Sequence, residues 1–405
     1  MERIVMHIDV NNAFLSWSAL DLLNKGYRTD IREIDAVIGG DEEKRKGIVL
    51  AKSTSCKAKG IKTADTLYQA RLKCPNLQIF APNFPFYKKK SSELFTLLRT
   101  YTPDIEVASI DECYLDYGKV KRLYGDEVKF AYQLKARIKK ELGFTVNIGI
   151  ANNKFCAKMA SDFSKPDKVH TLFKSEVKTK MFPLPIEDLF GIGKRSALKL
   201  REIGINTVKD LALYDRSKLY KFFKNMAFVM IDHANGLDDE EVDGSPYTPK
   251  GIGNELTLVE NTSDRNLIYD YLEAIAGNLA FRLRRDNKFA RVVCVTFKDA
   301  LFRRKNHQKK LVNPTCNKDV IFNSAKSIFN EMYNGYEEIR LIGIRLDSLT
   351  SAAYYQSSLF EDVEQKIKDD KLAKVLDNLK DKYGKDIIKK ANFSSKDNIE
   401  FKELK

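Results

Sequence analysis

ASIDECYLDYG, residues 108–118, places two acids side by side, Asp111 and Glu112, in a largely apolar and aromatic stretch. The longer segment 102–118 has an apolar run on each side of the acids, and this is the pattern of a β-hairpin that carries them at its tip. The sequence therefore predicts a strand–turn–strand unit whose turn presents two carboxylates.

A second candidate strand carries a third acid. RIVMHIDV, residues 3–10, is a short apolar run with several β-branched positions, which predicts a buried strand, and Asp9 lies near its end. If this strand neighbours the hairpin, three carboxylates converge, and they repel one another unless a hard cation such as Mg²⁺ neutralises them. Two such ions about 4 Å apart activate an attacking hydroxyl and stabilise a leaving pyrophosphate oxygen. From the residues alone, ordinary exposed turn acids without a metal remain the alternative interpretation.

The remaining segments predict several domains, the first of them an α/β sheet domain that returns to itself around a small basic insertion at residues 26–75. A helix follows the first strand, another is expected at about 126–141, and the strand FTVNIGIA and the helix NKFCAKMASDF come next. Short helices continue to about residue 234, and the acidic, Gly- and Pro-rich residues 236–250 predict a linker. Residues 251–349 then alternate in the order β-α-β-β-α-β.

The composition favours a polyanionic partner. The chain has 405 residues, enough for several packed units, and a formal net charge of +14. Nucleic acid is the partner class we expect, although a basic surface also serves solubility or weak membrane contact. We see no signal peptide and no stretch long enough to span a bilayer, and we expect a cytoplasmic protein. The six cysteines lack C-x-x-C spacing and predict reduced, mostly buried thiols.

Two features predict contacts with DNA phosphates. Gly191 and Gly193 lie between two helical segments and precede Lys194, as in a helix-hairpin-helix, where glycines let backbone N–H groups approach a phosphate. Between residues 282 and 310 there are eleven Lys or Arg against two acids, a cluster that makes binding salt-dependent and indifferent to sequence. The arginines that we expect at DNA are Arg282, Arg284, Arg285, Arg291, Arg303 and Arg304.

Three motifs together resemble those of the Y-family DNA polymerases, the translesion class. They are IDVNNAF, SIDECYLD and NIGIANNKFCAKMASDFSKPDK, in this order, and the resemblance runs from about residue 3 to residue 349. It implies an α+β multidomain fold: a palm with a mixed or antiparallel sheet plus helices, small fingers, a helical thumb with the helix-hairpin-helix, and a β-α-β-β-α-β little finger. The expected boundaries are residues 1–25 and 76–166 for the palm, 26–75 for the fingers, 167–235 for the thumb, 236–250 for the linker, 251–349 for the little finger and 350–405 for a C-terminal tail.

The resemblance also implies catalytic residues. Asp9, Asp111 and Glu112 correspond to the carboxylates that hold two Mg²⁺ ions, for which Mn²⁺ is a substitute, and the Val10 backbone carbonyl is a further metal ligand. Phe14 corresponds to the family's steric gate, an aromatic side chain that leaves no room for a ribose 2′-hydroxyl. Judged from the residues alone, Phe14 is instead an ordinary core aromatic of the first helix.

The same resemblance implies a nucleotide-binding set. Lys158 matches the family lysine that meets the incoming triphosphate, and Lys57 aligns with a basic residue of the fingers, although a lone lysine is usually a solvated surface charge. Where many members have Thr and Tyr contacting the phosphates, this chain has Ala51 and Thr54, which puts nucleotide affinity and the alignment of the fingers in question. The whole set is Asn11, Asn12, Ala13, Phe14, Lys57 and Lys158.

QSSLF, residues 356–360, resembles the bacterial clamp-binding peptide Q-x-x-L-F. In such a peptide Gln356 would cap a polar edge, and Leu359 and Phe360 would fill an apolar pocket. Its position directly after the expected little finger supports a sliding clamp as partner. For residues 361–405 we derive no function.

The function implied is template-directed, error-prone translesion DNA synthesis, in which a primer 3′-hydroxyl attacks the α-phosphate of a dNTP. The expected partners are primer–template DNA, dNTPs and the clamp; we expect a monomer and no membrane. Two alternatives are a catalytically inactive DNA-binding accessory protein of the same fold and a palm-like nucleotide cyclase. Retention of all three acids argues against the first, and a cyclase would not need the helix-hairpin-helix, the basic region or the clamp peptide.

Overall fold

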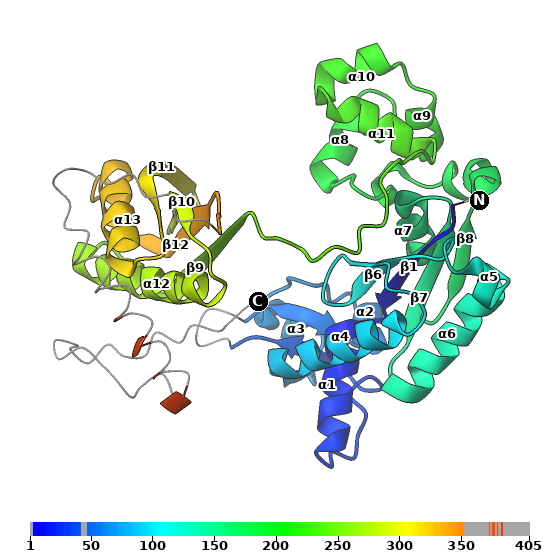
Figure 1. The fold of residues 1–405 in the computed structure, drawn as a ribbon, viewed down its shortest axis with the longest axis horizontal. Helices are drawn as coiled ribbons and strands as arrows, with labels where there is room; N and C mark the ends of the chain where they lie inside the picture. The colour runs from blue at the N-terminus through cyan, green and yellow to red at the C-terminus, as the bar shows by residue number, and fades with distance from the viewer. Residues whose placement is uncertain are drawn as a thin grey trace. The chain divides into compact units, whose positions relative to one another are not determined.

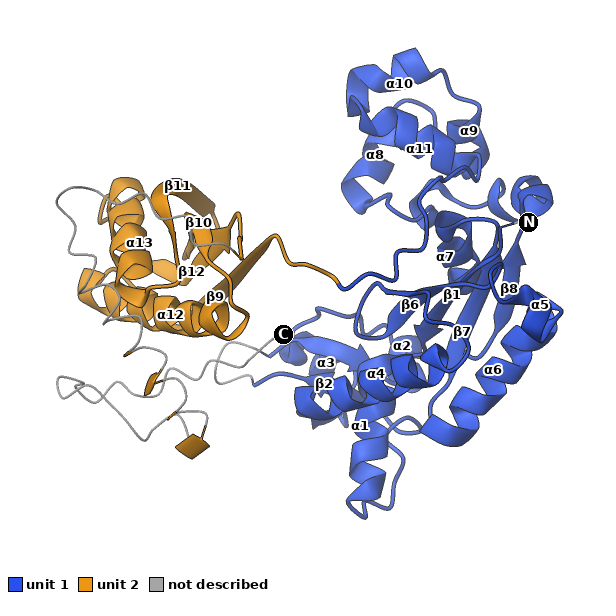
Figure 2. Ribbon diagram, viewed as in Figure 1, with its two compact units in different colours: residues 1–42, 47–246 blue, residues 43–46, 247–405 orange. Residues whose placement is uncertain are grey.

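The computed structural model describes residues 3–41, 47–351 and a few positions between 372 and 383 (Figure 1). The chain forms two compact units, one within residues 3–246 and the other from residue 247 onward (Figure 2). Among the described residues, no helix combines the length and the apolar character needed to cross a membrane. All six cysteines are buried as free thiols, as predicted.

A five-stranded mixed sheet forms the centre of the first unit. Its order is β5-β6-β1-β7-β8, with β1 (Val5–Val10), β5 (Ile105–Val107), β6 (Glu112–Asp116), β7 (Val146–Ala151) and β8 (Val169–Leu172). The central strand β1 is antiparallel to both β6 and β7, whereas β7 and β8 are parallel. The strand predicted at residues 3–10 and the second strand of the predicted hairpin are therefore neighbours, as the convergence of the acids requires.

The two faces of this sheet are covered by different helices (Figure 1). Side chains alternate along a strand, so Met6, Ile8 and Val10 face one core, and Val5 faces the other. The first core is closed by α1 (Ala13–Asn24), α4 (Phe84–Arg99) and α6 (Glu127–Leu142). The second core contains α7 (Lys154–Asp162). Because the period of a strand is two, Asp9 lies on the same face as Val5, toward α7.

A smaller sheet and several short helices complete the first unit. A three-stranded sheet, in the order β3-β2-β4, comprises β2 (Ala36–Gly39), β3 (Val49–Lys52) and β4 (Gln78–Phe80), with α2 (Thr54–Ala58) and α3 (Leu67–Lys73). The short helix α5 (Lys121–Tyr124) precedes α6. After β8 come short 3₁₀ and π turns over Lys174–Glu176, Val177–Met181 and Ile186–Asp188, and then α8 (Lys194–Glu202), α9 (Val208–Ala212), α10 (Arg216–Phe223) and α11 (Met226–Ala234).

The second unit is one antiparallel sheet with two helices. Its elements are β9 (Gly251–Thr262), α12 (Arg265–Arg285), β10 (Ala290–Asp299), β11 (Arg304–Thr315), α13 (Lys318–Met332) and β12 (Ile339–Asp347), and its strand order is β11-β10-β12-β9. The apolar faces of α12 and α13 share a core with the sheet. The predicted β-α-β-β-α-β order is confirmed.

The segment expected to be a linker has no helix or strand, but its first part is held on the first unit. The Gly236 carbonyl accepts a hydrogen bond from Asn153 Nδ2 at 2.8 Å, and the Asp238 carboxylate accepts one from the Phe155 N–H at 3.0 Å. Glu240 pairs with Lys154 Nζ at 3.2 Å. The Asp238 contact is favourable because the N-terminus of a helix such as α7 attracts anions, and Glu240 pairs with an opposite charge.

Candidate active site

The site lies where β1 and β6 meet. Asp9 and Glu112 are Cα partners across the two strands, and the Val10 N–H donates to the Asp111 carbonyl at 3.0 Å. Asp111 is the last residue of the turn before β6. Backbone pairing therefore brings the three predicted acids to one end of the sheet, although they are far apart in sequence.

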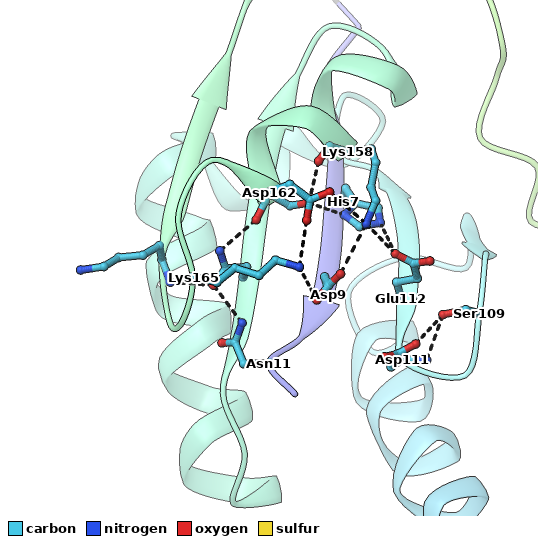
Figure 3. Close-up of polar contacts among 12 residues, drawn as sticks. His7, Asp9, Asn11, Ser109, Asp111, Glu112, Lys158, Asp162 and Lys165 are labelled. Atoms are coloured by element: carbon cyan, nitrogen blue, oxygen red, sulfur yellow. Dashed lines mark hydrogen bonds and ion pairs between the residues drawn. The ribbon is translucent and has the colours of Figure 1, made fainter. Parts of the chain in front are cut away.

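Lys158 of α7 binds two of these acids together. Its Nζ lies 2.8 Å from Glu112 Oε2 and 3.4 Å from Asp9 Oδ2, and only 11% of its side chain is exposed (Figure 3). Burial by itself would lower the pKa of Lys158, but the surrounding carboxylates raise it. Lys158 thus stays charged, and one cation is shared by Asp9 and Glu112.

The third acid, Asp111, is turned away from this cation (Figure 3). Its carboxylate accepts a hydrogen bond from Ser109 Oγ at 2.6 Å, and Ser109 Oγ in turn accepts one from the Asp111 N–H. Burial, followed by the negative charges of Asp9 and Glu112, raises the pKa of Asp111. Across the described ranges, no three or more His, Cys, Asp or Glu side chains are arranged as a metal site.

The donor set nevertheless fits a hard cation. Asp9 and Glu112 already converge on the ammonium of Lys158, which stands where a positive charge is needed. All of the candidate side-chain ligands are carboxylate oxygens, which Mg²⁺ and Mn²⁺ accept. Asp111 would complete the set by leaving Ser109.

His7 is a residue that sequence reasoning missed. The ring is fully buried, with Nδ1 2.8 Å from Ser161 Oγ and Nε2 3.3 Å from Glu112 Oε2. Chiefly through the His7 imidazole, and also through Lys158, the pKa of Glu112 is lowered to about 2. Burial lowers the pKa of His7 itself. The signal was present in the sequence, because residues i and i+2 of a strand share a face and His7 precedes Asp9 by two.

Lys165 is a second missed residue. Its Nζ lies 3.0 Å from Asp9 Oδ1 and 2.9 Å from Asp162 Oδ1. No local pattern in the sequence placed Lys165 at the site, because the return of the following loop toward β1 depends on tertiary contacts. One of these contacts is the hydrogen bond from the Asp167 N–H to Asn11 Oδ1 at 2.8 Å.

The predicted nucleotide-binding residues near β1 are held by different contacts. Asn11 is buried and donates to Asn147 Oδ1 at 3.0 Å, whereas Asn12 adopts a left-handed conformation (φ 48°) and donates to the Lys52 carbonyl at 2.6 Å. Ala13 is buried at the start of α1. Phe14 is half-buried and stacks on Tyr87, with ring centroids 4.9 Å apart.

The residues expected in the fingers lie on β3 and on the helix α2 that follows it. Lys57 is exposed on α2, and Thr54 is the exposed first residue of that helix. Ala51 is buried in β3. The Ser53 hydroxyl caps α2 by accepting a hydrogen bond from the Cys56 N–H. No described ion pair joins Lys57 to the acids of the site.

The predicted DNA-binding residues fall into two groups. Gly191 has a left-handed φ of 88° and Gly193 is the N-cap of α8, which begins at the exposed Lys194. In the second unit, Arg303 pairs with Asp299 at 2.6 Å and Arg304 pairs with Glu255. Four arginines thus have internal partners: Arg303 and Arg304, Arg284 with the Cys316 carbonyl, and Arg285 with Asp286. Arg282 is half-buried, and Nε of Arg291 is buried.

The predicted clamp-binding residues Gln356, Leu359 and Phe360 lie outside the described residues.

Comparisons with known proteins agree along the chain. Residues 8–162 match the impB/mucB/samB family, and residues 249–359 match the C-terminal domain of that family. A DNA polymerase IV from Clostridium acetobutylicum is 44% identical over 388 residues, covering 96% of this chain and 97% of that protein. DNA polymerase IV 1 of Bacillus subtilis is 33% identical, covering 96% and 92%.

A solved structure supports the same assignment. A Y-family DNA polymerase chimera matches with a TM-score of 0.76 at 25% identity, covering 86% of this chain and 100% of that one. The relatives match this chain over both of its units, and the chimera has a similar fold over 86% of this chain. This chain therefore belongs to the Y-family of DNA polymerases and is a DNA-directed DNA polymerase of the translesion class.

Proposed function

We propose that Asp9, Asp111 and Glu112 hold two divalent cations, Mg²⁺ with Mn²⁺ as a substitute, and that the Val10 carbonyl is a further ligand. Y-family DNA polymerases generally use divalent metal ions, which supply charge stabilisation in phosphoryl transfer. The observation that carries this proposal is the sharing of one ammonium by Asp9 and Glu112. Two carboxylates that converge on one ammonium support a cation site at this place.

The chain's own side chains position the reactants. Lys158 and Lys165 place two ammonium groups at the acids, where they can meet the negative charge of a dNTP triphosphate. Asn12 and Ala13 begin α1, and Phe14 on its first turn serves as the steric gate against a ribose 2′-hydroxyl. Lys57 adds a positive charge from the fingers. Holding the primer 3′-hydroxyl in line with the α-phosphate is the main contribution of the protein.

We further assign the domains by the family's order. Residues 1–25 and 76–166 form the palm, 26–75 the fingers, 167–235 the thumb, 236–250 the linker and 251–349 the little finger. Gly191, Gly193 and Lys194 contact DNA phosphates from the thumb. In the little finger, Arg282 is the arginine best placed for a phosphate, because four of the other five have partners within the protein.

The sliding clamp is the partner that we propose beyond DNA and dNTPs, and Gln356, Leu359 and Phe360 bind it. The polymerase works as a monomer in the cytoplasm. The clamp assignment is supported by the Q-x-x-L-F pattern directly after the little finger.

Primer extension with Mg²⁺ and dNTPs tests the proposed site. The wild type should extend a primed template, and Asp111→Ala should lower the rate by at least about a hundredfold because a carboxylate ligand is removed. Equal rates for the two proteins would contradict the metal site. Retained DNA binding without extension by either protein would favour an inactive accessory protein, and cyclic nucleotide formed without DNA would favour a cyclase.

A further inference from the structure

Asp162 joins the two lysines of the site and is not among the expected catalytic acids. Its Oδ2 lies 3.4 Å from Lys158 Nζ, and its Oδ1 lies 2.9 Å from Lys165 Nζ (Figure 3). Each lysine also contacts Asp9, and Lys158 contacts Glu112 as well. Both ammonium groups therefore have two separate anchors, one among the catalytic acids and one on Asp162.

The position of Asp162 is unfavourable for the helix that carries it. Asp162 is the last residue of α7, and the last turn of α7 has no basic residue. A carboxylate at a helix C-terminus lies at the negative end of the helix dipole. The pair with Lys158, four residues earlier, also has the weaker order, because the acid follows the base. Local helix stability thus gives no reason for an acid at this position.

A purely structural salt bridge is the simpler explanation of these contacts. It accounts for one pair, but it does not account for a carboxylate that contacts both lysines of the active site. The side chain of Lys158 is 11% exposed, so its charge is largely removed from water, whereas the side chains of Lys165 and Asp162 are 37% and 42% exposed. A buried ammonium such as that of Lys158 is costly when it loses its partners.

We propose that Asp162 is a positioning residue that keeps Lys158 and Lys165 beside the active site when Asp9 and Glu112 turn to a divalent cation. This inference rests on the proposed metal site. While the acids are free of metal, the lysines neutralise them. When the acids are engaged by a cation, the lysines lose their partners Asp9 and Glu112 but remain paired with Asp162. They are then held where a triphosphate arrives.

Mn²⁺ binding to the protein without DNA or nucleotide tests this role. The free Mn²⁺ signal in electron paramagnetic resonance gives the dissociation constant. Asp162→Asn should weaken binding about two- to fivefold, because the lysines then compete harder for Asp9 and Glu112. In a Lys158→Met/Lys165→Met background, the same substitution should leave the constant unchanged, since Asp162 acts through the lysines.

The second background separates this role from simple loss of negative charge. An equal loss of affinity in both backgrounds, or no loss in the wild-type background, would overturn the inference. If the double lysine variant does not give a folded thermal transition, Lys165→Met alone serves, and the effect of Asp162→Asn should then be smaller than in the wild type. Glu141→Gln, which removes a carboxylate paired with Arg137 on α6, is the matched control and should bind Mn²⁺ like the wild type.

The experiment also distinguishes this inference from the function on which it depends. A wild type that binds no Mn²⁺ and extends no primer would reject the metal site itself. A wild type that does both, with the same effect of Asp162→Asn in every background, would reject only the role of Asp162.

Discussion

His7 Nε2 lies 3.3 Å from Glu112 Oε2, so a fully buried imidazole contacts one of the proposed metal-binding carboxylates from within the sheet. The other ring nitrogen contacts Ser161 Oγ, and the hydroxyl of Ser161 lies 2.8 Å from the Lys158 carbonyl. The carboxylate is therefore placed between a ring fixed to α7 and an ammonium carried by α7. Second contacts of this kind orient metal ligands in proteins.

Replacement of His7 should separate positioning from packing. His7→Phe keeps an aromatic ring but removes both polar contacts. We expect about a tenfold to hundredfold loss of kcat and a weaker apparent affinity for Mg²⁺. His7→Gln keeps a donor and should recover part of the loss. Steady-state primer extension across Mg²⁺ concentrations measures both effects. Equal activity of the Phe variant and the wild type would show that the ring only fills space.

The low pKa of Glu112 predicts a contribution to stability that depends on pH. The pKa falls from an ordinary value of 4.5 to about 2, mainly through His7. Because the folded pKa is depressed, the charged carboxylate stabilises the fold above about pH 4.5, and this contribution is lost as the pH falls toward 2. After allowance for its partial exposure, we expect it to be worth about 1–2 kcal/mol.

Urea unfolding of the wild type and Glu112→Gln, both without metal, measures this contribution. The wild type should be the more stable protein at pH 6, and the difference should shrink between pH 4.5 and pH 3. Asp111, whose pKa is raised, works in the opposite direction, so Asp111→Asn should be at least as stable as the wild type at pH 6. A difference between wild type and Glu112→Gln that is the same at every pH would contradict the assigned pKa.

Phe14→Ala should admit ribonucleotides. The half-buried ring stacks on Tyr87 and packs at right angles to Phe84, so its position is fixed by neighbours rather than by the nucleotide. Removing it opens space at the start of α1, and single-nucleotide insertion should show the preference for dNTP over rNTP falling by at least about tenfold. Tyr87→Leu is a control for lost packing. Unchanged sugar selectivity in Phe14→Ala would reject the gate.

The sequence predicted the strands of the site well, because period-two burial dictates which face each residue occupies. Met6, Ile8 and Val10 must enter one core, and Asp9 is thereby directed to the other face. The order of helices and strands in the second unit was also predictable, because their apolar faces can be buried together when two helices pack on one sheet.

Other features depend on contacts that no local pattern encodes. The turn of Asp111 toward Ser109 depends on a rotamer, and the return of Lys165 to Asp9 depends on a loop docked against Asn11. The acidic segment after residue 236 lacked periodicity and predicted a linker. Its first part is nevertheless held at α7, where the Phe155 N–H binds the Asp238 carboxylate and Asn153 Nδ2 binds the Gly236 carbonyl.

Clamp-stimulated synthesis should depend on the peptide at 356–360. Leu359→Ala combined with Phe360→Ala removes the two apolar anchors, so stimulation by the clamp should be lost while synthesis without the clamp stays the same. Primer extension on a clamp-loaded template, compared with extension without the clamp, measures the ratio. Ser357→Ala, at a variable position of the peptide, is the matched control. Full stimulation of the double variant would remove the clamp assignment.

Salt dependence of DNA binding should divide the arginines of the second unit into two groups. Arg282, on the last turn of α12, has no ion pair within the described residues, whereas Arg303 is bound to the buried carboxylate of Asp299. Each phosphate neutralised contributes about 0.9 to the slope of log affinity against log salt. Arg282→Ala should therefore lower the slope by about 1.

Arg303→Ala should leave the slope unchanged and destabilise the turn between β10 and β11, where Asp299 accepts hydrogen bonds from the N–H groups of Leu301 and Arg303. Fluorescence anisotropy with primed DNA between 50 and 200 mM salt measures the slope, and thermal unfolding of both variants measures their stability. A lower slope for Arg303→Ala and an unchanged slope for Arg282→Ala would show that the Asp299 pair opens when DNA binds.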